Sequence, residues 1–218
     1  MFGNIDILGT ILSIPGAILA FSIKGWAKAF AADKLGDPTP RNLGKLTMNP
    51  MAHIDFLGFL FIVLFGFGWT KPIPVNTRNF KNIRRDNAIF ILSGPLACVL
   101  AGFISCLFAV ITGQFLGNNN IALYLYYMFV SATRLCVSLA AFYMLPLPGL
   151  DGYELIANFL PYKWYRKLYY IERYSMYIFI GFILLINITN LGAIIFWPAS
   201  QLLNLFYSFW GAVVSMIF

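Results

Sequence analysis

Long apolar segments constrain this chain more than any other feature. Hydrophobic residues make up 60% of its 218 positions and charged residues only 11%, against about 25% in an ordinary soluble domain. A helix that crosses a bilayer needs about 20 mostly apolar residues. Segments of this kind lie near residues 7–32, 88–115, 121–145 and 174–190, with a last apolar stretch at 191–218. The sequence therefore predicts an all-α, multi-pass integral membrane protein.

A shorter apolar segment, residues 55–69, is interrupted by Gly58, Gly66 and Gly68. It either crosses the membrane or re-enters on the same side, and the position of residues 191–218 relative to the membrane is also open. We expect five to six membrane segments in total, one of them a candidate re-entrant segment. No stretch has the composition of a soluble module, so a single domain over residues 1–218 is expected.

Basic residues gather in the loops between the apolar segments. Twelve of the fifteen Lys and Arg residues lie in the loops 33–53, 70–87 and 160–173. Cytoplasmic loops are enriched in Lys and Arg, so these loops are predicted to be cytoplasmic, which favours a re-entrant path for residues 55–69. The net charge of +7 then indicates contact with anionic lipid headgroups rather than with nucleic acid.

Three basic residues lie inside apolar segments: Lys24, Lys28 and Arg134. A charged side chain at the centre of a spanning helix costs about 2.5–3.5 kcal/mol and usually marks a functional site. Lys24 and Lys28 are four residues apart and therefore share one face of a helix. Lys28 lies near a helix end, so it can instead extend its ammonium group to the headgroups. Arg134 needs a carboxylate or carbonyl partner that the sequence does not identify.

Asp151 is the predicted anionic partner of the two lysines. It follows "LPLPGL", where prolines and a glycine break the helix, and irregular backbone at membrane depth occurs only where it lines a protein-enclosed cavity. Asp151 either projects into such a cavity or acts as the N-cap of a helix that runs from Gly152 to Phe159. The local sequence leaves both readings open.

Three ordered blocks carry a resemblance to a known family. They read "ADKLGDPTPRNLGKLTMNPMAHIDFLG", "GWTKPIPVNTRNFKNIRRDNAIFILSGP" and "LPLPGLDG", and the resemblance is strongest over residues 22–160. The chain resembles the site-2 protease family of membrane-embedded zinc metalloproteases, and within it the compact branch without regulatory domains. In that family a His-Glu-x-x-His helix and a later aspartate bind zinc, and the glutamate activates the attacking water.

The resemblance places Lys24, Gly25 and Lys28 at the first histidine, the glutamate and the second histidine, and leaves Asp151 as the only retained ligand position. A protonated lysine has no lone pair for a metal, and glycine cannot activate water. The resemblance therefore implies a catalytically inactive homologue, a pseudoprotease without a metal cofactor that acts as a membrane binding or regulatory protein. We expect a Lys24–Asp151 or Lys28–Asp151 ion pair in place of the zinc ion.

Other positions also depart from the family pattern. Tyr143 and Cys98 stand where the family often has asparagines. The single histidine of the chain, His53, is expected to be a hydrogen-bonded structural residue rather than a zinc ligand. Cys98, Cys106 and Cys136 lie within apolar segments without metal-ligand spacing, so they are predicted to be buried thiols.

The segment "KPIPVN" is the predicted partner-binding loop, with Lys71, Pro72, Pro74 and Asn76 as its marked residues. A basic loop that orients the helices explains the charges but not the two prolines. An extended segment of this kind can pair with a partner strand. The expected partners are membrane lipids and a membrane protein or one of its transmembrane segments.

Two alternative functions stay open at this stage. The first is an unconventional but active intramembrane zinc metallopeptidase that uses His53 and Asp151. The second is an ion- or proton-conducting protein in which the intramembrane charges form the pathway, although no internal repeat supports a transporter. The identity of the partner and the oligomeric state do not follow from the sequence.

Overall fold

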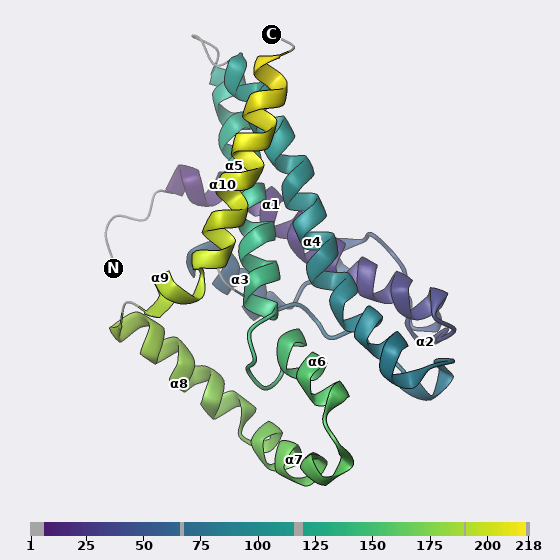
Figure 1. Ribbon diagram of the computed structural model, residues 1–218. Helices are drawn as coiled ribbons and strands as arrows, with labels where there is room; N and C mark the ends of the chain where they lie inside the picture. The colour runs from purple at the N-terminus through teal and green to yellow at the C-terminus, as the bar shows by residue number, and fades with distance from the viewer. Residues whose placement is uncertain (1–6, 66–67, 116–119, 190, 217–218) are drawn as a thin grey trace.

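The computed structural model describes residues 7–65, 68–115, 120–189 and 191–216 (Figure 1). Within these residues the regular structure is helical, apart from one isolated antiparallel bridge. Three long helices, α1 (Ile7–Lys34), α4 (Ile83–Gln114) and α5 (Asn120–Tyr143), pack against one another and form the core. The all-α prediction is confirmed.

The same three helices are long and apolar enough to cross a membrane. A fourth candidate is the bent pair α7 (Tyr165–Arg173) and α8 (Ser175–Ile188), whose two parts meet at 63°. The integral membrane character is thus confirmed, whereas the expected five to six segments are not: the described residues contain three candidates, or four with the bent pair.

Small residues let α1 and α5 approach closely. A Cβ atom on Gly16 of α1 would lie only 2.6 Å from the Cα atom of Ala132 on α5, so a larger residue would force the helices apart. Ala17 and Ala20 continue this contact and are fully buried. Close packing of this kind takes the place of a hydrophobic driving force between helices that lie in lipid.

Residues 55–69 return to the point from which they start. They contain α3 (Phe56–Phe65), which at ten residues is about 15 Å long and too short for a hydrocarbon core of about 30 Å. Ile54 and Thr70 form the isolated antiparallel bridge, so the two ends lie side by side. Residues 66 and 67 lie outside the described part of the chain.

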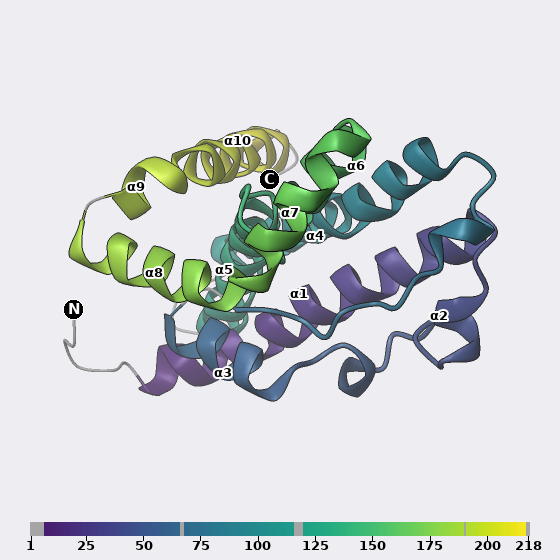
Figure 2. The same ribbon diagram turned by 90° about the horizontal axis from the view of Figure 1, so that it is seen from below.

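The second half of the chain closes around the end of α5. After Tyr143 the backbone turns into α6 (Asp151–Phe159), which packs beside α4, and then into α7 and α8 (Figures 1 and 2). Phe179 of α8 packs edge-on against Trp69 and Phe142. This contact joins α8 to α5 and to the segment that follows α3.

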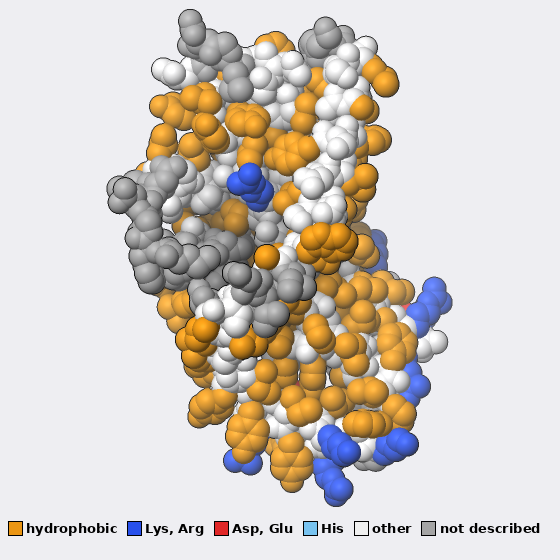
Figure 3. Space-filling view, turned by 60° about the vertical axis from the view of Figure 1, so that its left-hand side comes forward, with side chains coloured by type: hydrophobic (Ala, Val, Ile, Leu, Met, Phe, Trp, Pro, Cys, Tyr) orange, Lys and Arg blue, Asp and Glu red, His pale blue; other side chains and the backbone are white. Residues whose placement is uncertain are grey.

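The last long helix, α10 (Trp197–Ser215), runs along α4 and α5. One face of the molecule is covered mainly by hydrophobic side chains, with basic side chains gathered toward its lower end (Figure 3). The remaining short elements are α2 (Thr39–Asn42), α9 (Leu191–Ile195) and the 3-10 turns η1 (Pro50–Ala52), η2 (Thr77–Asn79) and η3 (Tyr162–Trp164).

Candidate functional site

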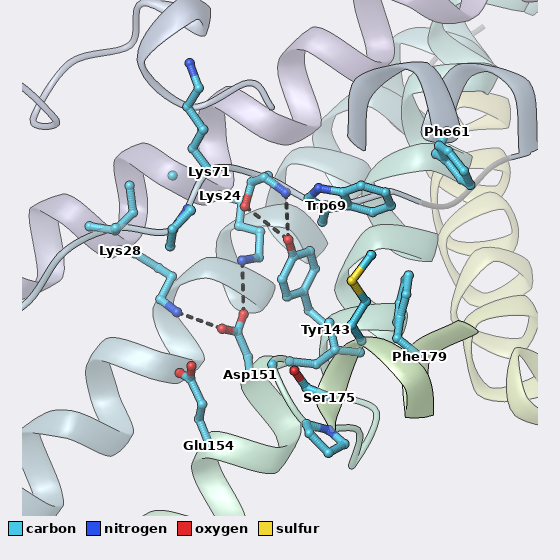
Figure 4. A pocket seen from close by; sticks show the side chains of 18 of the residues that line it. Lys24, Lys28, Phe61, Trp69, Lys71, Tyr143, Asp151, Glu154, Ser175 and Phe179 are labelled. Carbon is cyan, nitrogen blue, oxygen red and sulfur yellow. Dashed lines mark hydrogen bonds and ion pairs between the residues drawn. The ribbon is translucent and has the colours of Figure 1, made fainter. Parts of the chain in front are cut away.

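Lys24, Lys28 and Asp151 meet in the interior of the molecule (Figure 4). The Nζ atom of Lys28 donates a hydrogen bond to Oδ1 of Asp151 at 2.7 Å. The Nζ atom of Lys24 lies 3.1 Å from Oδ2, an ion-pair distance, although the angle is not that of a hydrogen bond. All three residues are at most 7% exposed. One buried carboxylate therefore contacts two ammonium groups.

Two local features bring these side chains together. Gly94 of α4 makes room for the lysines, because a Cβ atom there would lie 3.0 Å from Cγ of Lys28 and 3.1 Å from Cγ of Lys24. Asp151 is the first residue of α6; Leu150 is the N-cap and no side chain caps the helix. The N-cap interpretation of Asp151 is therefore wrong, and its carboxylate faces the lysines.

Two aromatic rings complete the surroundings of the ammonium groups. The Nζ atom of Lys24 lies 3.3 Å from the ring centroid of Tyr143, and that of Lys28 lies 4.6 Å from the ring centroid of Phe90. A desolvated cation–π contact contributes about 2 kcal/mol. The hydroxyl of Tyr143 accepts a hydrogen bond from the Thr70 N–H at 2.7 Å, so Tyr143 joins the cluster to the segment after α3. The sequence reasoning missed this role because it treated Tyr143 only as a lost asparagine.

This environment shifts the pKa values of two acidic residues of α6, Asp151 and Glu154. Burial raises the pKa of Asp151, but Lys24 and Lys28 outweigh burial and hold the pKa below its ordinary value of 3.8, so the carboxylate is ionised at neutral pH. Glu154, one turn later, also lines the site. Burial is the main reason that its pKa is raised, and Asp151 adds to the effect against the opposing lysines. The sequence reasoning did not include Glu154.

The cluster lines a cavity of about 710 Å³ between α1, α3, α4, α5, α6 and α8 (Figure 4). This volume lies within the range of about 300–1,000 Å³ that is usual for ligand pockets. The lining is mainly apolar away from the cluster and includes Leu57, Phe61, Trp69, Ile73, Val75, Phe90, Met176, Phe179, Ile180 and Ile183. The cavity therefore combines an apolar wall with one buried, positively charged corner.

The predicted partner-binding loop borders this cavity and is held at both ends. The Lys71 N–H donates to the His53 carbonyl at 2.8 Å, and the Asn76 N–H donates to Oδ2 of Asp37 at 2.8 Å. The ammonium group of Lys71 points away from the cluster, toward the carbonyl of Met51 at 3.2 Å (Figure 4).

Between these two anchors the backbone is neither helical nor part of a sheet. Pro72 and Pro74 have no N–H, whereas the N–H groups of Ile73 and Val75 have no hydrogen-bond partner within the described residues. The two free N–H groups therefore alternate with the two prolines along this segment.

Comparison with known proteins places the chain in a family. A Bacillus subtilis (strain 168) protein named "Putative zinc metalloprotease YwhC" is 34% identical to it over 184 residues, which cover 83% of this chain and 82% of that protein. The chain belongs to this zinc metalloprotease-like family. No family model and no solved structure matches it. Membership does not transfer an activity to the chain, because activity depends on the residues of the site.

The residues of this metalloprotease-like protein do not fit a catalytic zinc centre. Such a centre takes three protein ligands with nitrogen, oxygen or sulfur donors and leaves one position for water. Among the described residues, no three His, Cys, Asp or Glu side chains lie close enough to hold a metal ion. Lys24 and Lys28 face Asp151 as ammonium groups, which donate hydrogen bonds and cannot bind a cation.

Gly25 and His53 are in direct contact on one side of the cluster. A Cβ atom on Gly25 would collide with the imidazole ring of His53, which is fully buried. The Nε2 atom of His53 lies 2.7 Å from the Thr47 carbonyl oxygen and donates to it. Burial lowers the pKa of His53, with Lys45 adding to the effect, so the ring is neutral. His53 therefore fills the space beside Gly25 as a packed, hydrogen-bonded residue.

Arg134 is separate from the site. It is exposed on α5 and is not among the residues that line the cavity. Cys98, Cys106 and Cys136 are buried and free. The Sγ atom of Cys98 lies 3.6 Å from the Ala20 carbonyl, a packing role rather than a catalytic one.

Proposed function

We propose that this protein is a metal-free pseudoprotease of the site-2 protease type, which binds segments of membrane proteins without cutting them. One observation carries the proposal: Asp151 contacts both Lys24 and Lys28. The resemblance assigns these three positions to a zinc-ligand aspartate and two zinc-ligand histidines. The two ammonium groups supply the positive charge that a buried carboxylate needs in the absence of a metal.

The chemistry that remains does not support hydrolysis by the family mechanism. That mechanism needs a metal-activated water and a carboxylate that takes its proton. Gly25 offers no carboxylate at the position of the family's glutamate, and the His53 ring occupies the space beside it. What remains is a cavity, a segment with two free N–H groups and a buried positive charge, which together favour binding.

The binding mode that we propose is strand addition at residues 71–76. A partner segment that unwinds locally would pair with the N–H groups of Ile73 and Val75 and place its side chains in the adjoining cavity. The partners are membrane lipids and a membrane protein. The basic loops 33–53, 70–87 and 160–173 would face the cytoplasm, so the partner segment would enter from that side.

Zinc content tests the metal-free proposal. The protein is expressed with added zinc, purified, and its zinc-to-protein ratio is measured by mass spectrometry next to Asp151→Ala. We expect both samples to contain far less than one zinc per chain. Stoichiometric zinc that disappears in Asp151→Ala would overturn the proposal and favour an unconventional metallopeptidase.

A second experiment tests the binding mode. The probe is a fluorescent synthetic membrane-spanning peptide with two central glycines, which allow local unwinding, and its affinity is measured in vesicles. Ile73→Pro removes one free N–H and should weaken binding on the order of tenfold, which corresponds to one hydrogen bond of about 1–1.5 kcal/mol. Ile73→Leu keeps the N–H and is the matched control. Equal affinities for the two variants would rule out strand addition at this edge.

A further inference from the structure

Arg134 occupies an unfavourable position on the surface of a membrane-spanning helix. It is exposed on α5, which runs from Asn120 to Tyr143 and is a candidate span. Arg134 lies fourteen residues after the start of α5 and nine before its end, or about 21 Å and about 14 Å along the axis. A cation at this depth is costly in lipid and normally has a partner.

The described residues of the neighbouring helices do not supply a counter-charge at this depth. None of the ion pairs among the described residues includes Arg134. Helices α5 and α10 contain no acidic residue, and the only one in α4 is Asp86, in the first turn. The electrostatic neighbour on the adjacent helix is the phenol of Tyr207, which is not an anion.

Both α5 and α10 carry polar residues among their apolar ones. Ser131 and Ser138 share the face of Arg134 on α5 and are half-buried. On α10, exposed polar residues recur at four-residue intervals: Ser200, Asn204 and Ser208. Figure 3 shows one basic side chain in the mainly hydrophobic upper part of this face. Side chains of these types form hydrogen bonds between neighbouring membrane helices.

We infer that α5 and α10 form a docking surface for a membrane-spanning helix of a different protein, which carries an Asp or Glu opposite Arg134. Charge complementarity selects this occupant. A symmetric dimer through this face would bring two copies of Arg134 together, and a second copy has no acidic residue in α5 or α10 to offer. Lipid phosphates lie at the ends of the span rather than at this depth. The inference does not depend on the proposed function of the cavity.

The test uses two synthetic helices in neutral phosphatidylcholine vesicles at pH 8. Both are Leu/Ala membrane-spanning peptides with a fluorescent label; one carries a single central Glu and the other a Gln. Energy transfer to the labelled full-length protein measures their affinities. We expect the Glu peptide to bind on the order of tenfold more tightly, since polar contacts between membrane helices contribute about 1–2 kcal/mol.

Variants separate the charge from the rest of the surface. Arg134→Gln should abolish the preference for the Glu peptide, whereas Arg134→Lys should retain a part of it. Asn204→Leu should weaken both peptides equally and leave the preference unchanged. Equal thermal midpoints of all variants would show that the fold is intact, as expected for exposed side chains.

Five results would overturn the inference, of which four concern the peptides and the protein alone. These are no measurable binding of either peptide, equal affinities for both, a preference that survives Arg134→Gln, or self-association of the protein that Arg134→Gln abolishes. Displacement of the Glu peptide by anionic phosphatidylglycerol would also count against it, because Arg134 would then bind a lipid headgroup.

Discussion

Asp151→Asn should destabilise the protein more than any other single change in the lysine cluster. The substitution keeps the size of the side chain but removes the one negative charge that both ammonium groups share. Lys24, Lys28 and Asp151 have side chains that are 4%, 9% and 5% exposed, so water cannot replace the lost partner. Removing one member of a buried ion pair costs about 3–5 kcal/mol.

Two further variants bracket the loss of unfolding free energy expected for Asp151→Asn. Lys28→Met leaves Lys24 paired with Asp151 and removes the excess positive charge, so we expect a loss of about 2 kcal/mol or less, mainly from the 2.7 Å hydrogen bond. The triple variant Lys24→Met, Lys28→Met, Asp151→Asn contains no buried charge. Replacement of a whole buried ion cluster by apolar residues is often neutral or stabilising, so the triple variant should be more stable than Asp151→Asn alone.

Unfolding in mixed detergent and SDS micelles, followed by helical circular dichroism, measures these differences. Asp33→Asn is the control: the Asp33 side chain is 9% exposed, but its partner Arg41 is 63% exposed and can be hydrated when the pair is lost, so the expected cost is about 0–1 kcal/mol. An Asp151→Asn variant within about 0.5 kcal/mol of wild type, or a triple variant less stable than Asp151→Asn, would refute the view that the cluster is held by charge.

Three other substitutions test separate parts of the fold. Burial raises the pKa of Asp37, but its hydrogen bonds outweigh burial and lower the pKa below 3.8. The stability that the ionised Asp37 contributes is therefore present above about pH 4 and is lost as the pH falls through the folded-state pKa. The thermal midpoint of the wild-type protein should fall over this acid range, and Asp37→Asn should lack this part of the fall. Gly25→Ala should cost about 1–3 kcal/mol by overpacking, whereas Gly181→Ala, in open space, should cost nothing in the same unfolding assay. Tyr143→Phe leaves the buried Thr70 N–H without its partner, which should cost about 1–3 kcal/mol and speed hydrogen exchange at that amide.

The membrane architecture could be predicted because long apolar segments have few alternatives to helices in lipid. The number of segments could not. The short segment 55–69 folds back on itself through the Ile54–Thr70 bridge, a contact between residues sixteen positions apart that composition does not reveal. The last stretch contains α10, whose polar side chains keep it from qualifying as a span.

In the candidate site, too, one part of the arrangement could be predicted from the sequence and another part could not. Helical spacing placed Lys24 and Lys28 on one face, and chemistry suggested a carboxylate partner. The roles of Tyr143, Gly94 and Glu154 could not be predicted, because each depends on how separate helices pack. The Gly25–His53 contact likewise joins α1 to a loop and leaves no periodic signal in the sequence.

The segment after Lys71 has a consequence for stoichiometry. Pro72 and Pro74 have no N–H group, so between the two anchors only Ile73 and Val75 offer free N–H donors. In the proposed strand addition, two donors suffice for one short partner strand and are too few to template a growing sheet, which is the usual hazard of an exposed edge. Binding at this edge should therefore saturate at one segment per chain.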